Sequence, residues 1–525
     1  MHLRITAGVI LILSCCLSCG RTVDDTAYLE EITIRQLQDL YVRGERTAEQ
    51  VTADYLLRIA QLDKSGPTLN AIIYINPNAL AEARAMDAER KAGHIRGPLH
   101  GIPVVVKDNL NTRDMPTTAG ARALQNSIPP TDSWLVQRLR DAGAIIIAKA
   151  NLSEWANFRS RPSSSGWSGI GGQTRNPYVL DRNPSGSSAG SGAAASANLC
   201  VFAIGTETNG SIMSPSTRNG LVGLKPTVGL ISRSGIIPIS ATQDTPGPMA
   251  RSVEDIAVSL GQLVGSDATD SVTLAGEGKR LNDYTPFLKL DGLRGKRLGV
   301  LKRSMGFHGK TDSLFRQALR DIQAQGAELV DLDFTIGNDV GPASFQVLLY
   351  EFKAGVNGYL MSLGDKAPVK DLAAIIAFNK QDSLGLRYFN QALLEQSQAK
   401  GDLSEKAYRD ARTLMLKATR DEGIDKLLKD YKLDALLSPT GAPAGFTDWI
   451  NGDHQVGGSS TLAAVAGYPS LTVPMGFVET LPVGISFSAS AWQEPVLLEM
   501  AYAYEQATRH RRKPDLLTSR GWEAR

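Results

Sequence analysis

The sequence predicts an α/β fold: a single large domain with a central mixed, mostly parallel sheet covered by helices on both faces. Continuous apolar runs such as residues 102–106 (IPVVV) are typical of strands buried on both faces. These runs alternate with helical patterns, as in residues 131–151, where a helix, a glycine stop and an apolar strand follow one another. No internal repeat or Pro-rich linker divides the 525 residues, so one domain is favoured.

The first third of the chain is rich in predicted helix. Thr33 with Gln36, and Thr47 with Gln50, have the spacing of capping boxes ahead of apolar-periodic segments. Residues 79–92 form a further charged, alanine-rich helix before the first strand. The alternation of strand and helix then recurs in three later segments: residues 296–302 (KRLGVLK), 314–334 and 433–440 (LDALLSPT).

The charge of the chain is close to balanced. There are 56 Lys and Arg against 54 Asp and Glu, a formal net charge of +2. Such a chain lacks the basic surface expected of a nucleic-acid-binding protein, and a small molecule or a peptide is the better predicted partner. Nothing in the composition implies an obligate protein partner.

Residues 1–19 have the pattern of a signal peptide. Arg4 precedes an apolar run at residues 5–13, and small residues lead to a polar change at Arg21. Cys15 or Cys19 would be the lipidated residue if the signal is of the lipoprotein type; simple cleavage is the alternative. We therefore expect an exported bacterial protein that is periplasmic, secreted or anchored to the membrane by lipid.

Cysteine and histidine usage argues against two kinds of site. After removal of the signal only Cys200 is certain to remain, so a disulfide framework is excluded, and its apolar surroundings place it in the core. The six histidines are scattered without paired spacing, and no metal site is predicted.

Residues 185–192 read SGSSAGSG, with four serines and three glycines. A phosphate loop would need the lysine of the GxxxxGK[ST] pattern, and a linker would need a change of composition on its far side; neither is present. Nucleophilic catalysis by serine remains, but no histidine lies nearby to act as base. Lys107 follows the apolar strand, and burial there would lower its pKa and favour the neutral amine.

Three blocks of sequence carry a resemblance to a known family. They are residues 97–109 (GPLHGIPVVVKDN), 183–198 (NPSGSSAGSGAAASAN) and 203–232 (AIGTETNGSIMSPSTRNGLVGLKPTVGLIS). In order and spacing they resemble the amidase signature family of serine hydrolases. The resemblance runs from about Thr33 to about Arg512 and implies an amidase domain over residues 28–515 with the amidase signature fold.

The resemblance implies a Ser-Ser-Lys triad. Lys107 matches the base, Ser187 the bridging serine and Ser211 the nucleophile, with the family's spacing of 24 residues between the two serines. It also implies a cis peptide bond between Gly186 and Ser187. Gly186 and Ser188 are the expected supporting residues, the first by allowing the turn and the second by hydrogen bonding.

The resemblance also implies an oxyanion hole for the tetrahedral intermediate of amide hydrolysis. The backbone N–H groups of Thr208, Asn209 and Gly210 would form it. Many family members have a glycine and an arginine where this chain has Asn209 and Met213. Because backbone groups make the oxyanion contacts, the chemistry should tolerate both differences, whereas the acyl pocket would change in shape.

The implied reaction is hydrolysis of linear carboxamides to carboxylate and ammonia through an acyl-serine, without a cofactor. Segments such as residues 151–158 (NLSEWANF) and 231–252 resemble the peptide amidase branch, so C-terminal amides of peptides are the expected substrates. Three alternatives remain: a broad aryl or aliphatic amidase, the amidase component of a tRNA-linked amidotransferase, and an extracytoplasmic solute-binding lipoprotein.

Overall fold

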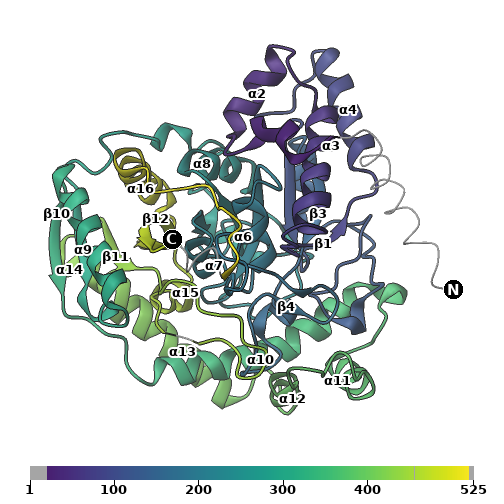
Figure 1. The fold of residues 1–525 in the computed structure, drawn as a ribbon. Helices are drawn as coiled ribbons and strands as arrows, with labels where there is room; N and C mark the ends of the chain where they lie inside the picture. Colours follow the sequence, from purple (N-terminus) through teal and green to yellow (C-terminus); the bar gives the residue numbers. More distant parts are fainter. Residues whose placement is uncertain (1–20, 455, 520–525) are drawn as a thin grey trace.

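The computed structural model describes residues 21–454 and 456–519, so the predicted signal peptide and its cysteines lie outside the described residues. Eleven strands form one sheet through the middle of the molecule (Figure 1). Their spatial order is β1 (Ile72–Ile75), β3 (Ile145–Ala150), β2 (Pro103–Lys107), β6 (Phe202–Glu207), β8 (Thr245–Ala250), β7 (Val222–Lys225), β12 (Ser470–Val478), β13 (Leu481–Ser488), β11 (Ala435–Pro439), β9 (Arg297–Leu301) and β10 (Glu328–Leu332).

The single large α/β domain and the mixed sheet are confirmed, but the expectation of a mostly parallel sheet is wrong. Six neighbouring strand pairs are antiparallel and four are parallel. The parallel pairs join β2 to β3 and β6, and β9 to β10 and β11, which are the strands that the apolar runs indicated. The antiparallel centre contains β7 (VGLK) and β8 (TPGPMA), whose Gly and Pro residues hide the strand pattern.

Helices cover both faces of the sheet, as expected (Figure 1). One face carries α3 (Ala48–Arg58), α4 (Ala79–Lys91), α5 (Trp134–Asp141), α8 (Val253–Leu263), α9 (Gly309–Ala324) and α16 (Glu494–Thr508). The other face carries α6 (Ala189–Ser196), α7 (Met213–Arg218) and α14 (Asp425–Tyr431). No helix in the described part of the chain is long and apolar enough to span a bilayer.

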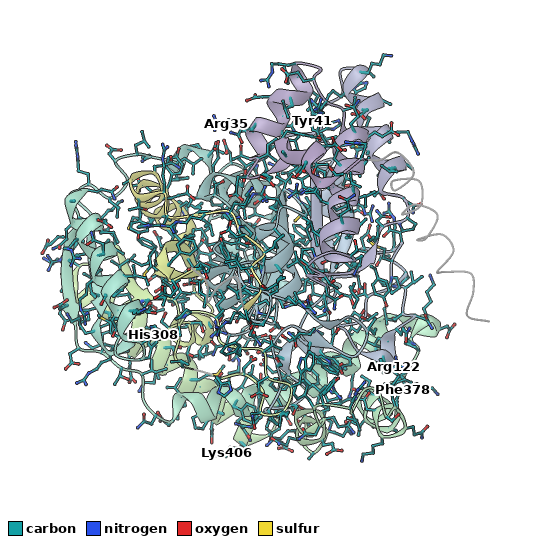
Figure 2. All side chains as sticks on the ribbon, viewed as in Figure 1. Arg35, Tyr41, Arg122, His308, Phe378 and Lys406 are labelled. Carbon is teal, nitrogen blue, oxygen red and sulfur yellow. The ribbon has the colours of Figure 1, made fainter. Side chains whose placement is uncertain are left out.

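The remaining long helices form a layer along the edge of Figure 1 that lies opposite α2 (Ile34–Val42). They are α10 (Val340–Ser362), α11 (Leu372–Gln381), α12 (Ala392–Gln398) and α13 (Lys406–Thr419), with the short α15 (Thr461–Ala466) packed against α13. Arg122 lies beside α11, which carries Phe378 (Figure 2), and its guanidinium pairs with Asp382 at 2.6 Å. A separate apolar core packs this helical layer against the segments around residues 119–124, 155–158 and 237–239. It includes Trp155, Phe158 and Phe352.

Local sequence signals agree with these elements. Both capping boxes form: the Thr33 hydroxyl accepts a hydrogen bond from Gln36 N at the start of α2, and the Thr47 hydroxyl accepts one from Gln50 N at the start of α3. Cys200 is fully buried in the main core, as expected, and burial raises the pKa of its thiol to about 12. A thiol in that environment is inert.

Candidate active site

Lys107 is the last residue of β2 and its side chain is completely buried. Its Nζ lies within hydrogen-bonding distance of Ser187 Oγ (2.8 Å), Ser188 Oγ (3.0 Å), and both Oγ1 (2.8 Å) and the carbonyl oxygen (3.2 Å) of Thr206. Since β2 pairs directly with β6, Thr206 is held beside Lys107 by the sheet itself. Four oxygens therefore surround the amine, and among the described residues no carboxylate is one of its hydrogen-bond partners.

The electrostatic surroundings favour the neutral amine. Burial lowers the pKa of Lys107 to about 7, while the negative charges of Asp244 and Glu207 oppose that shift from a greater distance. At neutral pH a substantial part of the Lys107 population therefore carries a lone pair. An amine in this state can accept a proton.

Two other lysines, Lys149 and Lys225, are also completely buried, so burial alone does not identify a base. Lys149 pairs with Asp108 at 3.2 Å and bonds to backbone and threonine oxygens. Lys225 donates to the Pro226 carbonyl at 3.0 Å. Lys107 differs from both because its amine contacts serine hydroxyls of the Ser/Gly stretch.

The Ser/Gly stretch is ordered and leads directly into α6. The peptide bond between Gly186 and Ser187 is cis, as the resemblance implied. A side chain at Gly186 would collide with Ser153 Oγ, which explains the glycine. Ser188 precedes the helix; its hydroxyl donates to the Thr206 carbonyl at 3.0 Å and accepts from Thr206 N at 3.2 Å.

The hydrogen bonds of Ser188 limit what the Lys107 amine can do. Because the Ser188 hydroxyl hydrogen is used on the Thr206 carbonyl, its oxygen can only accept from Lys107. The Thr206 carbonyl is likewise only an acceptor. A neutral amine has two N–H groups and one lone pair, so these two acceptors can use both hydrogens and leave the lone pair for a hydroxyl donor, either Ser187 or Thr206, whose hydroxyl oxygens each lie 2.8 Å from Nζ.

Ser211 lies in the turn between β6 and α7 and is 9% exposed. Its carbonyl accepts a hydrogen bond from Ser188 N at 3.2 Å, so the two serine-bearing segments are adjacent. Among the described residues, Ser211 Oγ has no hydrogen-bond partner, and its side chain lines a cavity. The structure thus brings Lys107, Ser187 and Ser188 into one hydrogen-bonded group and places Ser211 beside it without a bond to Ser187.

The residues expected to form the oxyanion hole lie in the same turn. Within the described part of the chain, the N–H groups of Thr208, Asn209 and Gly210 donate no hydrogen bond, and all three residues line the cavity. The side chain of Thr208 bonds to Asp244 at 2.5 Å, and Asn209 Oδ1 accepts from Ser460 Oγ at 2.8 Å. Both side chains are therefore tied to their neighbours, and the backbone donors remain available.

Sequence reasoning missed the residues that fix this turn. Glu207 is buried, and one of its oxygens accepts from Ile212 N at 2.8 Å and Met213 N at 3.0 Å, which anchors the start of α7. Asp244 holds Thr208, and burial raises the pKa of its carboxyl to about 6. The only sequence signal for Glu207 was a polar residue at the end of an apolar strand, and Asp244 had none beyond the family segment around it.

The cavity has a volume of about 550 Å³. Its walls combine apolar side chains of Phe158, Ile239 and Leu348 with the charged groups of Arg218 and Asp453. This size is typical of a site for a small molecule or a short peptide. Among the described residues, no three His, Cys, Asp or Glu side chains are grouped so as to hold a metal ion.

The fold and this cavity define an α/β enzyme. The sequence model of the amidase family matches residues 50–498, so the chain belongs to the amidase family and is an amide-hydrolysing enzyme. This assignment replaces the alternative of a solute-binding lipoprotein.

Individual relatives are similar over nearly the whole chain. A probable amidase of Arabidopsis thaliana is 38% identical over 510 residues, covering 94% of this chain and 93% of the relative. A glutamyl-tRNA(Gln) amidotransferase component of Synechococcus is 34% identical, covering 92% and 93%. The solved peptide amidase of Stenotrophomonas maltophilia is 48% identical with a TM-score of 0.87, covering 93% of this chain and 99% of that one.

Proposed function

We propose that this amidase removes the terminal amide nitrogen from C-terminal peptide amides through an acyl-serine formed on Ser211. The observation that carries the proposal is the contact of 2.8 Å between the buried Lys107 amine and Ser187, beside a cavity that contains a free Ser211 hydroxyl. Similarity to the Stenotrophomonas peptide amidase supports the choice of substrate, because it extends over almost all of both chains.

In the first half of the proposed reaction, neutral Lys107 accepts the proton of Ser187, and Ser187 accepts the proton of Ser211 as its oxygen attacks the amide carbonyl. The relay needs a hydrogen bond between the two serine hydroxyls. We expect rotation of the Ser211 side chain about its Cα–Cβ bond to form it, because the Ser211 carbonyl already accepts a hydrogen bond from Ser188 N at 3.2 Å. Such contacts often tighten only when substrate binds.

The tetrahedral intermediate would place its negative oxygen on the N–H groups of the turn from Thr208 to Gly210. Its collapse breaks the carbon–nitrogen bond, and the proton held by Lys107 returns through Ser187 to the leaving nitrogen, which departs as ammonia. Water then attacks the acyl-serine by the reverse relay and gives the carboxylate. Each proton taken up in one half is returned in the same half, so the enzyme is regenerated.

We further propose that the amidase domain spans residues 28–515 and that the protein is exported. Residues 1–19 support export by their signal-like pattern alone. Attachment of lipid to Cys15 or Cys19 rests on the same pattern and would be read directly from the mass of the mature protein.

Ammonia release from a panel of amides tests the proposed substrate class. The panel contains peptide amides, aryl amides, short aliphatic amides and glutamine, each measured as kcat/KM. Peptide amides are expected to exceed the others by at least about tenfold. Equal rates on all classes would favour the broad amidase, and a preference for glutamine would favour the amidotransferase-like alternative.

A further inference from the structure

Arg218 lies in the cavity with Ser211 but has no part in the proposed proton relay. It is the last residue of α7, and its main-chain carbonyl is fixed by a hydrogen bond from Asn176 Nδ2 at 2.8 Å. The side chain is partly buried and lines the cavity wall. Its position is therefore set by the same short helix that follows the expected nucleophile.

The guanidinium of Arg218 has unused hydrogen-bonding capacity. Its Nε is buried without a hydrogen-bond partner, and no described residue forms a hydrogen bond or an ion pair with the group. Burial lowers the pKa of Arg218, and the attraction of the Asp453 carboxylate only partly opposes this shift. Among the described residues, other buried arginines do have partners: Arg511 pairs with Glu31 at 2.7 Å, and Arg251 donates to the Ala195 carbonyl at 2.9 Å.

Asp453 is the acidic group that faces Arg218, and it does not saturate the guanidinium. The Asp453 carboxylate attracts the cation through space, yet the two groups form no contact within 4.0 Å. Its oxygens already accept hydrogen bonds from Asn183 Nδ2 at 2.8 Å, from Ser165 N at 2.9 Å and from the Ser165 hydroxyl. The N–H groups of the planar Arg218 guanidinium are thus available to a ligand in the cavity that Arg218 lines.

We propose that Arg218 binds a carboxylate on the acyl part of the substrate, so that the enzyme prefers peptide amides with an acidic side chain near the amide. The inference rests on the proposed function, because ammonia is then the leaving group and every other substrate atom belongs to the acyl part. A carboxylate matches the two-pronged geometry of a guanidinium better than a single carbonyl oxygen does.

The length of the helix indicates which substrate residue carries the carboxylate. Arg218 is seven positions after Ser211, and the five steps within α7 (Met213–Arg218) rise about 7.5 Å, so the two Cα atoms lie on the order of 10 Å apart. An extended peptide covers that distance in about three residues. The acidic side chain is therefore expected on the second or third residue counted from the amide.

Two acetylated peptide amides test the proposal: Ac-Glu-Glu-Leu-NH2 and Ac-Gln-Gln-Leu-NH2, which have nearly the same shape and differ in charge. The ratio of their kcat/KM values is expected to favour the Glu peptide by about tenfold or more in the native enzyme. Arg218→Gln should bring that ratio close to one, mainly through a higher KM for the Glu peptide. Arg218→Lys should restore part of the ratio, since it keeps the charge but loses the fork.

Two further variants sharpen the test. Asp453→Asn removes the nearest negative charge and should increase the ratio, whereas Arg161→Gln removes an exposed arginine stacked on Phe345, outside the cavity wall, and should leave it unchanged. A native ratio near one, an equal loss on both peptides in Arg218→Gln, or a lower ratio in Asp453→Asn would overturn the carboxylate assignment.

Binding separates this inference from the proposed function. In a Ser211→Ala background, which cannot turn substrate over by the proposed route, calorimetry gives Kd for both peptide amides directly. Tighter binding of the Glu peptide that is lost in Ser211→Ala/Arg218→Gln supports Arg218 even if the native enzyme releases no ammonia from either peptide. Equal Kd values for the two peptides would refute the role of Arg218, whatever the turnover.

Discussion

The pH dependence of amide hydrolysis tests whether Lys107 is the base. Burial lowers the pKa of Lys107 to about 7, and a base works only in its neutral form. The value of kcat/KM is therefore expected to rise from acid pH and to level off above about pH 8. The sign follows from deprotonation: each step down in pH below the pKa converts more of the amine to ammonium.

The size of the rise distinguishes a buried lysine from an ordinary one. A group with a pKa of 7 is about 9% neutral at pH 6 and about 90% neutral at pH 8, which gives a roughly tenfold increase. A lysine with the usual pKa of about 10.4 would give a roughly hundredfold increase over that interval and no plateau. The assay is initial-rate ammonia release from a peptide amide at constant ionic strength. A flat profile between pH 6 and 8, or a rise that continues tenfold per unit above pH 8, would refute the assignment.

A charge change near Lys107 should move this profile in a defined direction. Asp244 raises the pKa of Lys107 by electrostatic attraction, so Asp244→Asn is expected to shift the rise to lower pH. Asp255→Asn is the matched control, because burial also raises the pKa of Asp255 to about 6 but its carboxylate bonds to Ile34 N at 2.8 Å. The control should leave the midpoint in place, and a shift to higher pH in Asp244→Asn would contradict the electrostatic argument.

Three further substitutions test other parts of the site. Ser211→Ala should abolish labelling by a fluorophosphonate and reduce ammonia release to background; full labelling of the variant, measured by mass spectrometry, would rule out Ser211 as the nucleophile. Gly186→Ala places a Cβ against Ser153 Oγ and should lower kcat/KM by at least about tenfold, whereas the wild-type rate in this variant would show that the close approach is not needed. Cys200→Ser buries a hydroxyl in the core and should cost about 1–3 kcal/mol of unfolding free energy by denaturant titration, with kcat/KM almost unchanged; a large loss of activity in the folded variant would reveal a functional thiol.

The fold class followed from the sequence because buried parallel strands carry an unmistakable pattern. The runs that became β2 and β3 are continuously apolar, and a predicted helix separates them. The antiparallel centre was missed because β8 contains two prolines and a glycine and reads as a loop. β8 is a strand because it pairs with β6 on one side and with β7 on the other, although its own residues do not indicate a strand.

The site was only partly accessible to the same reasoning. Lys107 and Ser187 are 80 positions apart, so no local spacing connects them, and the family resemblance alone paired them before the fold did. Glu207, Asp244 and Arg218 had no motif of their own. Their significance depends on which atoms face the cavity and which are already hydrogen bonded, and only three-dimensional contacts contain that information.

The cavity is lined by two stretches of the chain, and only the earlier one contains the proton-transfer groups. Lys107, Ser187 and Ser211 all precede residue 250, whereas wall residues such as Leu348 and Asp453 come from the later part of the chain. Mutations in residues 340–460 can therefore reshape what the enzyme accepts while the proton-transfer groups stay in place. Because the proton-transfer groups lie outside residues 340–460, that stretch is a suitable region to vary in a library aimed at new amides.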